Sequence, residues 1–172
     1  MNPLPPTKQA ALIVGAGDAT GSAIARRFAR EGLIACATRR DADKLQPLIK
    51  EIQASGGQAH GFASDARKEE QVIALMEQIE RDIAPIEVMV FNIGANVPCS
   101  ILEETARKYF KIWEMATLSG FLVGREVAKR MVQRQRGTII FTGATAGLRG
   151  SANFAAFAGA KHALRALAQS MA

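Results

Sequence analysis

The sequence is poor in the residues that mark several specialised classes of protein. Its 172 residues include two cysteines, one tryptophan and one tyrosine. Cys36 and Cys99 lie far apart and form no Cys-x-x-Cys pair, so the sequence indicates neither a disulfide framework nor a metal site. No apolar run approaches the ~20 residues that a membrane-spanning helix needs. Residues 1–9 lack the apolar core of a signal peptide and are predicted to be a flexible leader on a cytoplasmic protein.

The formal charge of +6 would suit a protein that binds nucleic acid. However, basic residues are mixed with acids, as at Arg125 and Glu126, and no nucleic-acid recognition motif is present. Because aromatic residues are also scarce, we expect no nucleic-acid partner and assign the charge to a solvated surface that attracts anionic cofactors. With a hydrophobic content of 48%, residues 1–172 are predicted to form a single globular domain.

A glycine-rich stretch near the N-terminus carries the strongest signal. Residues 11–14 form an apolar run, Gly15, Gly17 and Gly21 follow, and residues 22–31 alternate apolar and basic side chains at helical spacing. A strand, a glycine turn and a helix in this order bring backbone N–H groups and a helix N-terminus to a nucleotide phosphate. An ordinary tight turn between a strand and a helix is the alternative interpretation.

The rest of the chain alternates predicted strands with predicted helices. This alternation indicates an α/β fold, a doubly wound and mostly parallel sheet with helices on both faces. Ligands of such sheets bind at the carboxyl ends of the strands. Gly15, Arg39, Asp65, Asn92 and residues 142–145 all follow predicted strands, which suggests one common cleft. The further strands are predicted at 33–38, 58–63, 86–91 and 137–142, and the further helices at 43–54, 69–83, 103–135 with a bend near 119–120, and 151–172.

At these residues the sequence resembles the short-chain dehydrogenase/reductase family over nearly its whole length. The glycine pattern, the motif Asn92-Ile93-Gly94, the strand at 137–141 and the segment 156–161 follow the family's order and spacing. The resemblance implies a Rossmann sheet, a nicotinamide cofactor, and an acid at Asp65 that holds the adenine amino group. The cofactor-binding residues that it implies are Gly15, Gly17, Ala19, Thr20, Gly21, Arg39, Arg40, Asp65, Ala66, Asn92, Gly94 and Lys161.

The end of the second predicted strand bears on the choice of cofactor. Enzymes that prefer NAD carry an acid there, which accepts both hydroxyls of the adenine ribose. This chain has Thr38, Arg39 and Arg40 instead, and Asp41 comes too late in the chain for that role. Because guanidinium forks suit a 2′-phosphate, we expect NADP(H) to be preferred over NAD(H). A solvated arginine pair after a strand is the alternative.

The catalytic residues of the family are mostly altered. The family uses a Tyr-x-x-x-Lys pair, a serine thirteen residues before the tyrosine, and an asparagine in the preceding long helix. Only Lys161 matches, and the tyrosine, serine and asparagine positions hold Phe157, Ala144 and Thr117. A phenyl ring cannot exchange a proton with a substrate oxygen, so the usual acid–base step lacks its donor.

Other side chains remain candidates for that proton. Thr142 and Thr145 flank Ala144 and could supply a hydroxyl, and Tyr109 is the sole tyrosine. His60 and His162 are expected to be surface or packing residues rather than bases.

Two functions from different classes therefore stay open. The first is an oxidoreductase that moves hydride between NADP(H) and a carbonyl or alcohol substrate of unknown identity, with weak or altered catalysis. The alternative is a non-catalytic nucleotide-binding or assembly protein on the same scaffold. Family membership favours the first, and the pair Phe157 and Ala144 favours the second.

Two further expectations concern the surface. Members of the family usually continue beyond the last predicted helix, so the fifth strand would be an uncovered sheet edge. Either the chain is C-terminally incomplete or something else covers this edge, and the sequence leaves both open. The predicted helices at 103–135 and 151–172 carry apolar side chains on more than one side, and the family pairs these helices around a two-fold axis. We therefore expect a homodimer or homotetramer.

Overall fold

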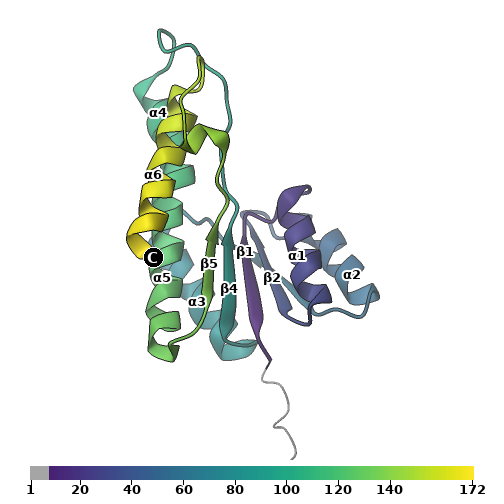
Figure 1. Ribbon diagram of the computed structural model, residues 1–172. Coiled ribbons are helices and arrows are strands. Elements are labelled where there is room, and N and C mark those ends of the chain that lie inside the picture. The colour runs from purple at the N-terminus through teal and green to yellow at the C-terminus, as the bar shows by residue number, and fades with distance from the viewer. Residues whose placement is uncertain (1–7) are drawn as a thin grey trace, which may run out of the picture.

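The computed structural model describes residues 8–172 (Figure 1). Most of the predicted leader, residues 1–7, lies outside the described residues, while the Gln9 carbonyl already accepts a hydrogen bond from the Ile34 amide. The strands are β1 (Ala10–Val14), β2 (Ile34–Arg39), β3 (Ala59–Ala63), β4 (Ile86–Phe91) and β5 (Thr138–Phe141). The helices are α1 (Thr20–Arg30), α2 (Gln46–Ala54), α3 (Glu69–Asp82), α4 (Ala106–Trp113), a π-helical turn (Glu114–Leu118), α5 (Ser119–Arg134) and α6 (Ala155–Met171), with short 3₁₀ turns at Asp43–Leu45 and Thr145–Gly147.

The five strands form one parallel sheet in the order β3-β2-β1-β4-β5. The chain order reverses between β1 and β4, since β2 and β3 lie on one side of β1, and β4 and β5 on the other. This reversal is the point at which doubly wound sheets bind ligands. The predicted α/β fold is therefore confirmed, and its switch point lies between the ends of β1 and β4.

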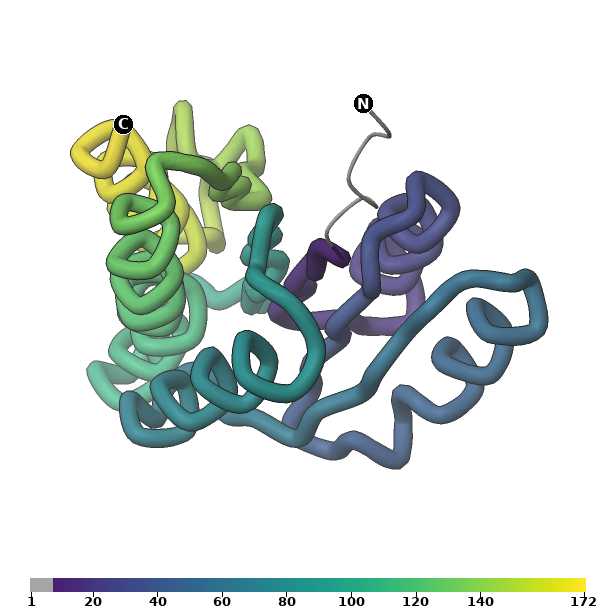
Figure 2. Tube along the Cα trace, turned by 90° about the horizontal axis from the view of Figure 1, so that it is seen from below, coloured from purple at the N-terminus to yellow at the C-terminus, as the bar shows by residue number. Residues whose placement is uncertain are grey.

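Helices cover the sheet in two groups. Figure 2 shows α1 and α2 on one side of the molecule, and α3, α5 and α6 gathered on the other. β1 is buried along its whole length, with Leu12 packed toward the α3 and α5 side and Ile13 toward α1 and α2. Side chains that alternate between two apolar layers produce the nearly continuous hydrophobic runs typical of parallel strands.

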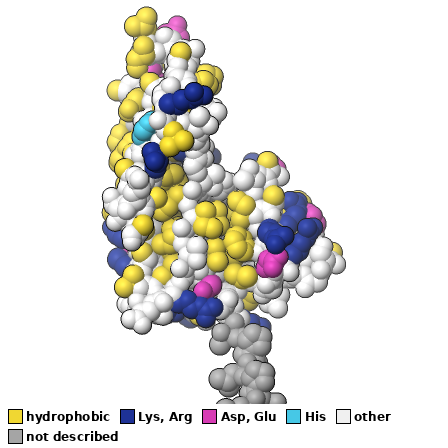
Figure 3. All heavy atoms as spheres, in the orientation of Figure 1, with side chains coloured by type: hydrophobic (Ala, Val, Ile, Leu, Met, Phe, Trp, Pro, Cys, Tyr) yellow, Lys and Arg dark blue, Asp and Glu magenta, His cyan; other side chains and the backbone are white. Residues whose placement is uncertain are grey.

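β5 is one of the two edge strands of the sheet in the described structure, with β3 at the opposite edge. Its Ile140 side chain is 42% exposed although it belongs to a parallel strand. Figure 3 shows the apolar surface that results, over the strands and between α1 and the helices of the other group. The expectation of an uncovered fifth strand is thus met for residues 8–172.

Several predicted boundaries were wrong, above all in the long helix. The predicted helix at 103–135, with a bend near 119–120, is instead α4, the π-helical turn and α5. Thr105 sets the start, because its side chain accepts a hydrogen bond of 3.2 Å from the Lys108 amide and caps α4. The last helix begins four residues later than predicted, after a turn in which Asn153 adopts a φ of 65°.

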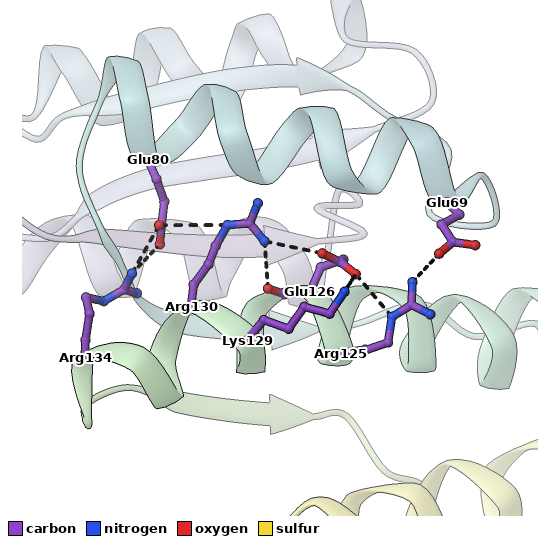
Figure 4. A network of polar contacts seen from close by, with 7 residues as sticks. All are labelled: Glu69, Glu80, Arg125, Glu126, Lys129, Arg130 and Arg134. Atoms are coloured by element: carbon purple, nitrogen blue, oxygen red, sulfur yellow. Dashed lines mark hydrogen bonds and ion pairs between the residues drawn. The ribbon is translucent and has the colours of Figure 1, made fainter.

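An ion-pair network joins α3 to α5 (Figure 4). At its centre the Glu126 carboxylate is 4% exposed and accepts hydrogen bonds from Arg125 and Lys129, and a longer one from Arg130. Arg125 also pairs with Glu69 of α3, as Arg130 does with another glutamate of that helix. Burial raises the pKa of Glu126, but hydrogen bonds from Lys129 and Arg125 outweigh it and hold the pKa below its usual value.

We predict that Glu126→Ala destabilises the fold by about 1–3 kcal/mol, because it leaves three cations around a buried position without their shared anion. Glu69→Ala removes an exposed pair on the same arginine and should cost less than about 1 kcal/mol. Urea unfolding of both variants measures the difference. Equal destabilisation by the two substitutions would contradict the central role of Glu126.

None of the helices formed by residues 8–172 is both long and apolar enough to cross a membrane.

Candidate functional site

A cleft of about 360 Å³ opens at the carboxyl ends of the strands, at the switch point. It is formed by the glycine turn after β1, the ends of β2, β3 and β4, and the π-helical turn. Eight predicted cofactor residues meet in it, and three others lie beside it at the start of α1. The lining residues are Val14, Gly15, Gly17, Thr38, Arg39, Arg40, Ser64, Asp65, Ala66, Arg67, Asn92, Ile93, Gly94, Met115 and Ser119.

The glycine turn needs glycine at two positions for close packing. Gly15 has a φ of 86°, and a Cβ there would lie 2.8 Å from the Ile93 side chain. A Cβ on Gly21 would lie 2.5 Å from the Gly15 carbonyl oxygen. Gly17 differs, because a Cβ there would meet nothing within 4 Å. The turn is thus tightly packed on its inner side and open at Gly17, where it borders the cleft.

The N-terminus of α1 completes this side of the cleft. Ala19 precedes the first turn, and no side chain of the described residues caps it. Thr20 and Gly21 are the first helical residues, and the Ser22 hydroxyl donates to the Gly17 carbonyl at 2.8 Å. An uncapped helix end carries unpaired N–H groups and a positive partial charge, which suit the pyrophosphate of a dinucleotide.

Two arginines border the cleft at the end of β2. Arg39 is the last residue of the strand, and its Nη1 lies 2.7 Å from the Asp18 carboxylate. Arg40 is exposed beside it. The nearby Asp41 accepts a hydrogen bond from the Asp43 amide and pairs with Lys44 at 3.6 Å, so its carboxylate is engaged within its own turn.

Asp65 follows β3 and is held by Arg67. The guanidinium donates to both carboxylate oxygens, at 2.9 Å and 2.5 Å. The backbone amide of Arg67 also donates to Oδ1, and this hydrogen bond closes an Asx-turn. These hydrogen bonds hold the pKa of Asp65 below its usual value. The adjoining Ala66 is buried. The carboxylate is therefore ionised and fixed at the wall of the cleft.

Ser64 supplies a further polar group to the same wall. Its hydroxyl oxygen is buried, and among residues 8–172 it has no hydrogen-bond partner. A buried hydroxyl without a partner costs free energy unless a ligand or water satisfies it. Ser64, the open face at Gly17 and the arginines together show a cleft whose donor set fits a dinucleotide.

Asn92 connects the ends of β1 and β4. Its amide donates to the Val14 carbonyl at 2.8 Å, and its side-chain Nδ2 donates to the Gly15 carbonyl at 3.2 Å. Gly94 follows, and a Cβ there would lie 3.6 Å from Lys161 Nζ. The motif thus supports the glycine turn and faces the lysine of α6.

Lys161 is 5% exposed. Its Nζ donates to the Thr142 carbonyl at 2.8 Å and more weakly to the Ile93 carbonyl at 3.4 Å. Burial lowers the pKa of this ammonium group. The Phe157 ring lies one turn earlier on α6, with its centroid 6.0 Å from Nζ. Lys161, which the resemblance assigns to the family pair, is therefore buried behind Gly94, and the ring beside it is the phenyl group of Phe157.

The other two positions that the resemblance assigns to catalysis, Thr117 and Ala144, offer no free hydroxyl to Lys161. The Thr117 hydroxyl donates to the Ala160 carbonyl at 2.9 Å and joins the π-helical turn to α6. Ala144 is exposed and lines, with Lys161, a separate groove of about 280 Å³ beside β5.

Tyr109 does not face the lysine. A Cβ on Gly159 would lie 2.8 Å from the Tyr109 hydroxyl, so this side chain packs against Gly159. Gly159 lies two residues from both Phe157 and Lys161, and residues two apart point to opposite sides of a helix. The structure therefore places the Tyr109 hydroxyl on the side of α6 that faces away from Lys161. His162 is exposed, and its Nδ1 lies 2.9 Å from the Ala158 carbonyl oxygen of the same helix.

Sequence reasoning missed several residues of the cleft. Met115 of the π-helical turn and Ser119, the first residue of α5, both reach it, and the extra residue of the π-helical turn changes the faces that they occupy. A pattern search at 3.6 residues per turn cannot detect such a change. Arg67 was detectable in principle, because Asp65 and Arg67 have the spacing of an aspartate-led turn. Among the described residues no group of His, Cys, Asp and Glu side chains could hold a metal ion.

Comparison with known proteins identifies the family that shares this architecture. The family model for short chain dehydrogenases matches residues 9–172. The chain is 29% identical over 163 residues to 2-dehydro-3-deoxy-D-gluconate 5-dehydrogenase of Formosa agariphila, covering 94% of this chain and 62% of that protein. It is 28% identical to 2,3-dihydro-2,3-dihydroxybenzoate dehydrogenase of Bacillus subtilis, covering 89% of this chain and 59% of that one.

Solved structures agree. A short-chain dehydrogenase from Rhodopseudomonas palustris superposes with a TM-score of 0.90 at 49% identity, over 97% of this chain and 78% of the other. A variant of actinorhodin polyketide ketoreductase, solved with NADPH, gives a TM-score of 0.89 at 27% identity, over 95% and 65%. The chain spans about 60% of the length of the curated relatives that it matches. With the family model matching almost every described residue, the chain belongs to the short-chain dehydrogenase/reductase family.

Proposed function

We propose that this chain binds NADP(H) in the cleft and that its carbonyl or alcohol chemistry is weak or altered. The observation that carries the proposal is that eight of the predicted cofactor residues line one cleft, while the ring beside Lys161 is a phenyl group without a hydroxyl. The small-molecule substrate remains a carbonyl or alcohol compound of unknown identity, and the cytoplasmic location remains a prediction from the N-terminal composition.

The preference for NADP(H) is supported by charge at the end of β2. Arg39 and Arg40 border the cleft, and the nearest following acid, Asp41, is engaged with Lys44. A 2′-phosphate beside two guanidinium groups gains charge-assisted hydrogen bonds that a ribose hydroxyl cannot match. The ketoreductase of the comparison was solved with NADPH, which is consistent with this preference.

The weak catalysis follows from the surroundings of Lys161. A bound nicotinamide would supply or accept the hydride. The substrate oxygen then needs a proton or a positive partner as its charge develops. Lys161 is buried beside Phe157, and its ammonium group already donates to the Thr142 carbonyl at 2.8 Å. It can attract an oxyanion or bind ribose hydroxyls, but no phenol relays its proton.

The alternative, a non-catalytic nucleotide-binding or assembly protein, is favoured by the same positions. Phe157 and Ala144 carry no hydroxyl, and the Thr117 hydroxyl is used to join two helices. Each substitution leaves the scaffold intact while removing a group that chemistry needs. Turnover of a carbonyl panel separates the two functions.

Self-association through α5 and α6 is part of the proposal. A shallow, mainly apolar groove of about 540 Å³ runs between these helices on their outer side. Phe121 and Val132, both of α5, line it and are 40% and 74% exposed. Covering this face with a second copy around a two-fold axis would bury these side chains, giving a homodimer or, with a second interface, a homotetramer.

For the cofactor we expect NADPH to bind more tightly than NADH. Arg40→Ala should weaken NADPH binding by about 1–3 kcal/mol and leave NADH nearly unchanged, because it removes a charge-assisted contact to the 2′-phosphate alone. Isothermal titration calorimetry measures both affinities. Arg81→Ala, which alters an exposed arginine at the far end of α3, is the control. A wild-type preference for NADH, or equal losses for both nucleotides, would refute the proposed role.

For catalysis we expect the wild-type chain to reduce ordinary ketones and aldehydes at or near the background rate. The double variant Phe157→Tyr, Ala144→Ser should be faster by about 10²-fold or more, because it restores a general acid and an oxygen-binding hydroxyl. NADPH absorbance on a carbonyl panel measures both, with Ala144→Ser alone as the control. A wild-type rate equal to that of the double variant would show that another residue carries the proton.

For assembly we expect light scattering at micromolar concentration to give a dimer or tetramer mass. Val132→Asp should shift the mass toward the monomer, since it places a charge in the groove between α5 and α6. Leu148→Asp is a matched control, because Leu148 is 64% exposed but lies beside the β5 edge. If Leu148→Asp alone dissociated the protein, the β5 edge rather than α5 and α6 would be the interface.

A further inference from the structure

One ion pair at the edge of the cleft joins the glycine turn to the end of β2. Asp18 lies in the glycine turn, and its Oδ1 is 2.7 Å from Nη1 of Arg39 at the end of β2. The Arg39 side chain is 24% exposed, whereas the Asp18 side chain is 88% exposed. The same Nη1 has a longer contact of 3.5 Å with the Lys44 carbonyl oxygen. The pair therefore links two loops that border the cleft.

The position of this pair determines what it can affect. In doubly wound dinucleotide sites, the residue at the end of the second strand faces the 2′ position of the adenine ribose. Arg39 occupies that position, and its guanidinium already has a carboxylate partner. The carboxylate of Asp41, the next acid along the chain, does not compete for it, because it pairs with Lys44 and accepts a hydrogen bond from the Asp43 amide.

Resting on the proposed NADP(H) function, we propose that Asp18 is a specificity-determining residue that lowers the preference for NADP(H). Its carboxylate competes with the 2′-phosphate for the Arg39 guanidinium. NADP(H) must displace Asp18 to use Arg39, whereas NAD(H) carries only hydroxyls and leaves the pair in place.

The exposure of the two side chains makes this exchange feasible. An exposed ion pair is weak, so a phosphate with nearly two negative charges can replace a single carboxylate. Once displaced, Asp18 stays in solvent and loses little solvation. Its charge nevertheless remains close to the phosphate and repels it at low salt. Both effects weaken the phosphate-bearing nucleotide and spare the other.

The test compares wild type with Asp18→Asn, which keeps the shape of the side chain and removes its charge. Nucleotide fluorescence titrations with NADPH and NADH, and calorimetry with adenosine 2′,5′-bisphosphate and AMP as fragments, give the affinities. We expect Asp18→Asn to bind NADPH and the bisphosphate about three- to tenfold more tightly, with NADH and AMP changed less than about twofold. The gain should shrink in 1 M salt, where charges are screened within about 3 Å.

Two further variants identify the route of the effect. In an Arg39→Ala background, Asp18→Asn should improve NADPH binding by less than about twofold, because the competed group is gone. Asp82→Asn removes an exposed carboxylate paired with Arg81 at the end of α3, and it should change neither affinity.

The outcomes separate the inference from the function on which it rests. If wild type binds neither NADPH nor NADH, the proposed function and the inference both fail. If both bind but Asp18→Asn changes nothing, or gains equally with Arg39 removed, the inference alone is overturned.

Discussion

The contact between the glycine turn and the end of β4 is the constraint on which the rest of the site depends. Gly15 can approach Asn92 and Ile93 only because it has no Cβ, and the Asn92 side chain then fixes the turn from the other strand. Ile93 connects this contact to α6, because its carbonyl accepts a hydrogen bond from Lys161. One close approach of two backbones thus connects the glycine turn, the end of β4 and the lysine of α6.

The two ends of the site differ in how they use polar groups. At the end of the cleft formed by β2 and β3, charged side chains are paired with one another, as Asp65 is with Arg67 and Arg39 is with Asp18. At the lysine end, hydrogen bonds run to backbone carbonyls and the neighbouring ring is apolar. A guanidinium group paired with an exposed carboxylate is held in position, and another anion can replace that carboxylate. This end of the cleft therefore suits the binding of an anion. An ammonium group already bound by carbonyls is better suited to holding a structure together than to transferring protons.

Much of the fold was predictable because its signals are local. Short runs rich in apolar residues, bounded by glycine, proline or polar residues, identified every strand to within one or two residues. The cleft walls were harder to predict. Asp18 and Arg39 are distant in sequence, and their pairing depends on how two loops meet in space. Met115 depends on a π-helical turn, whose irregular hydrogen bonding leaves no apolar period to detect.

The exposed apolar surface at β5 also has a thermodynamic consequence. Unfolding normally raises the heat capacity because apolar surface passes from the interior into water, by about 12–15 cal/mol/K per residue. Ile140 is already partly hydrated in the folded chain, as are the apolar side chains that Figure 3 shows over the strands. Surface that is already hydrated adds nothing to the heat-capacity change of unfolding. The free energy of unfolding of this chain therefore varies less steeply with temperature than that of a Rossmann domain of equal length whose sheet is covered on both faces.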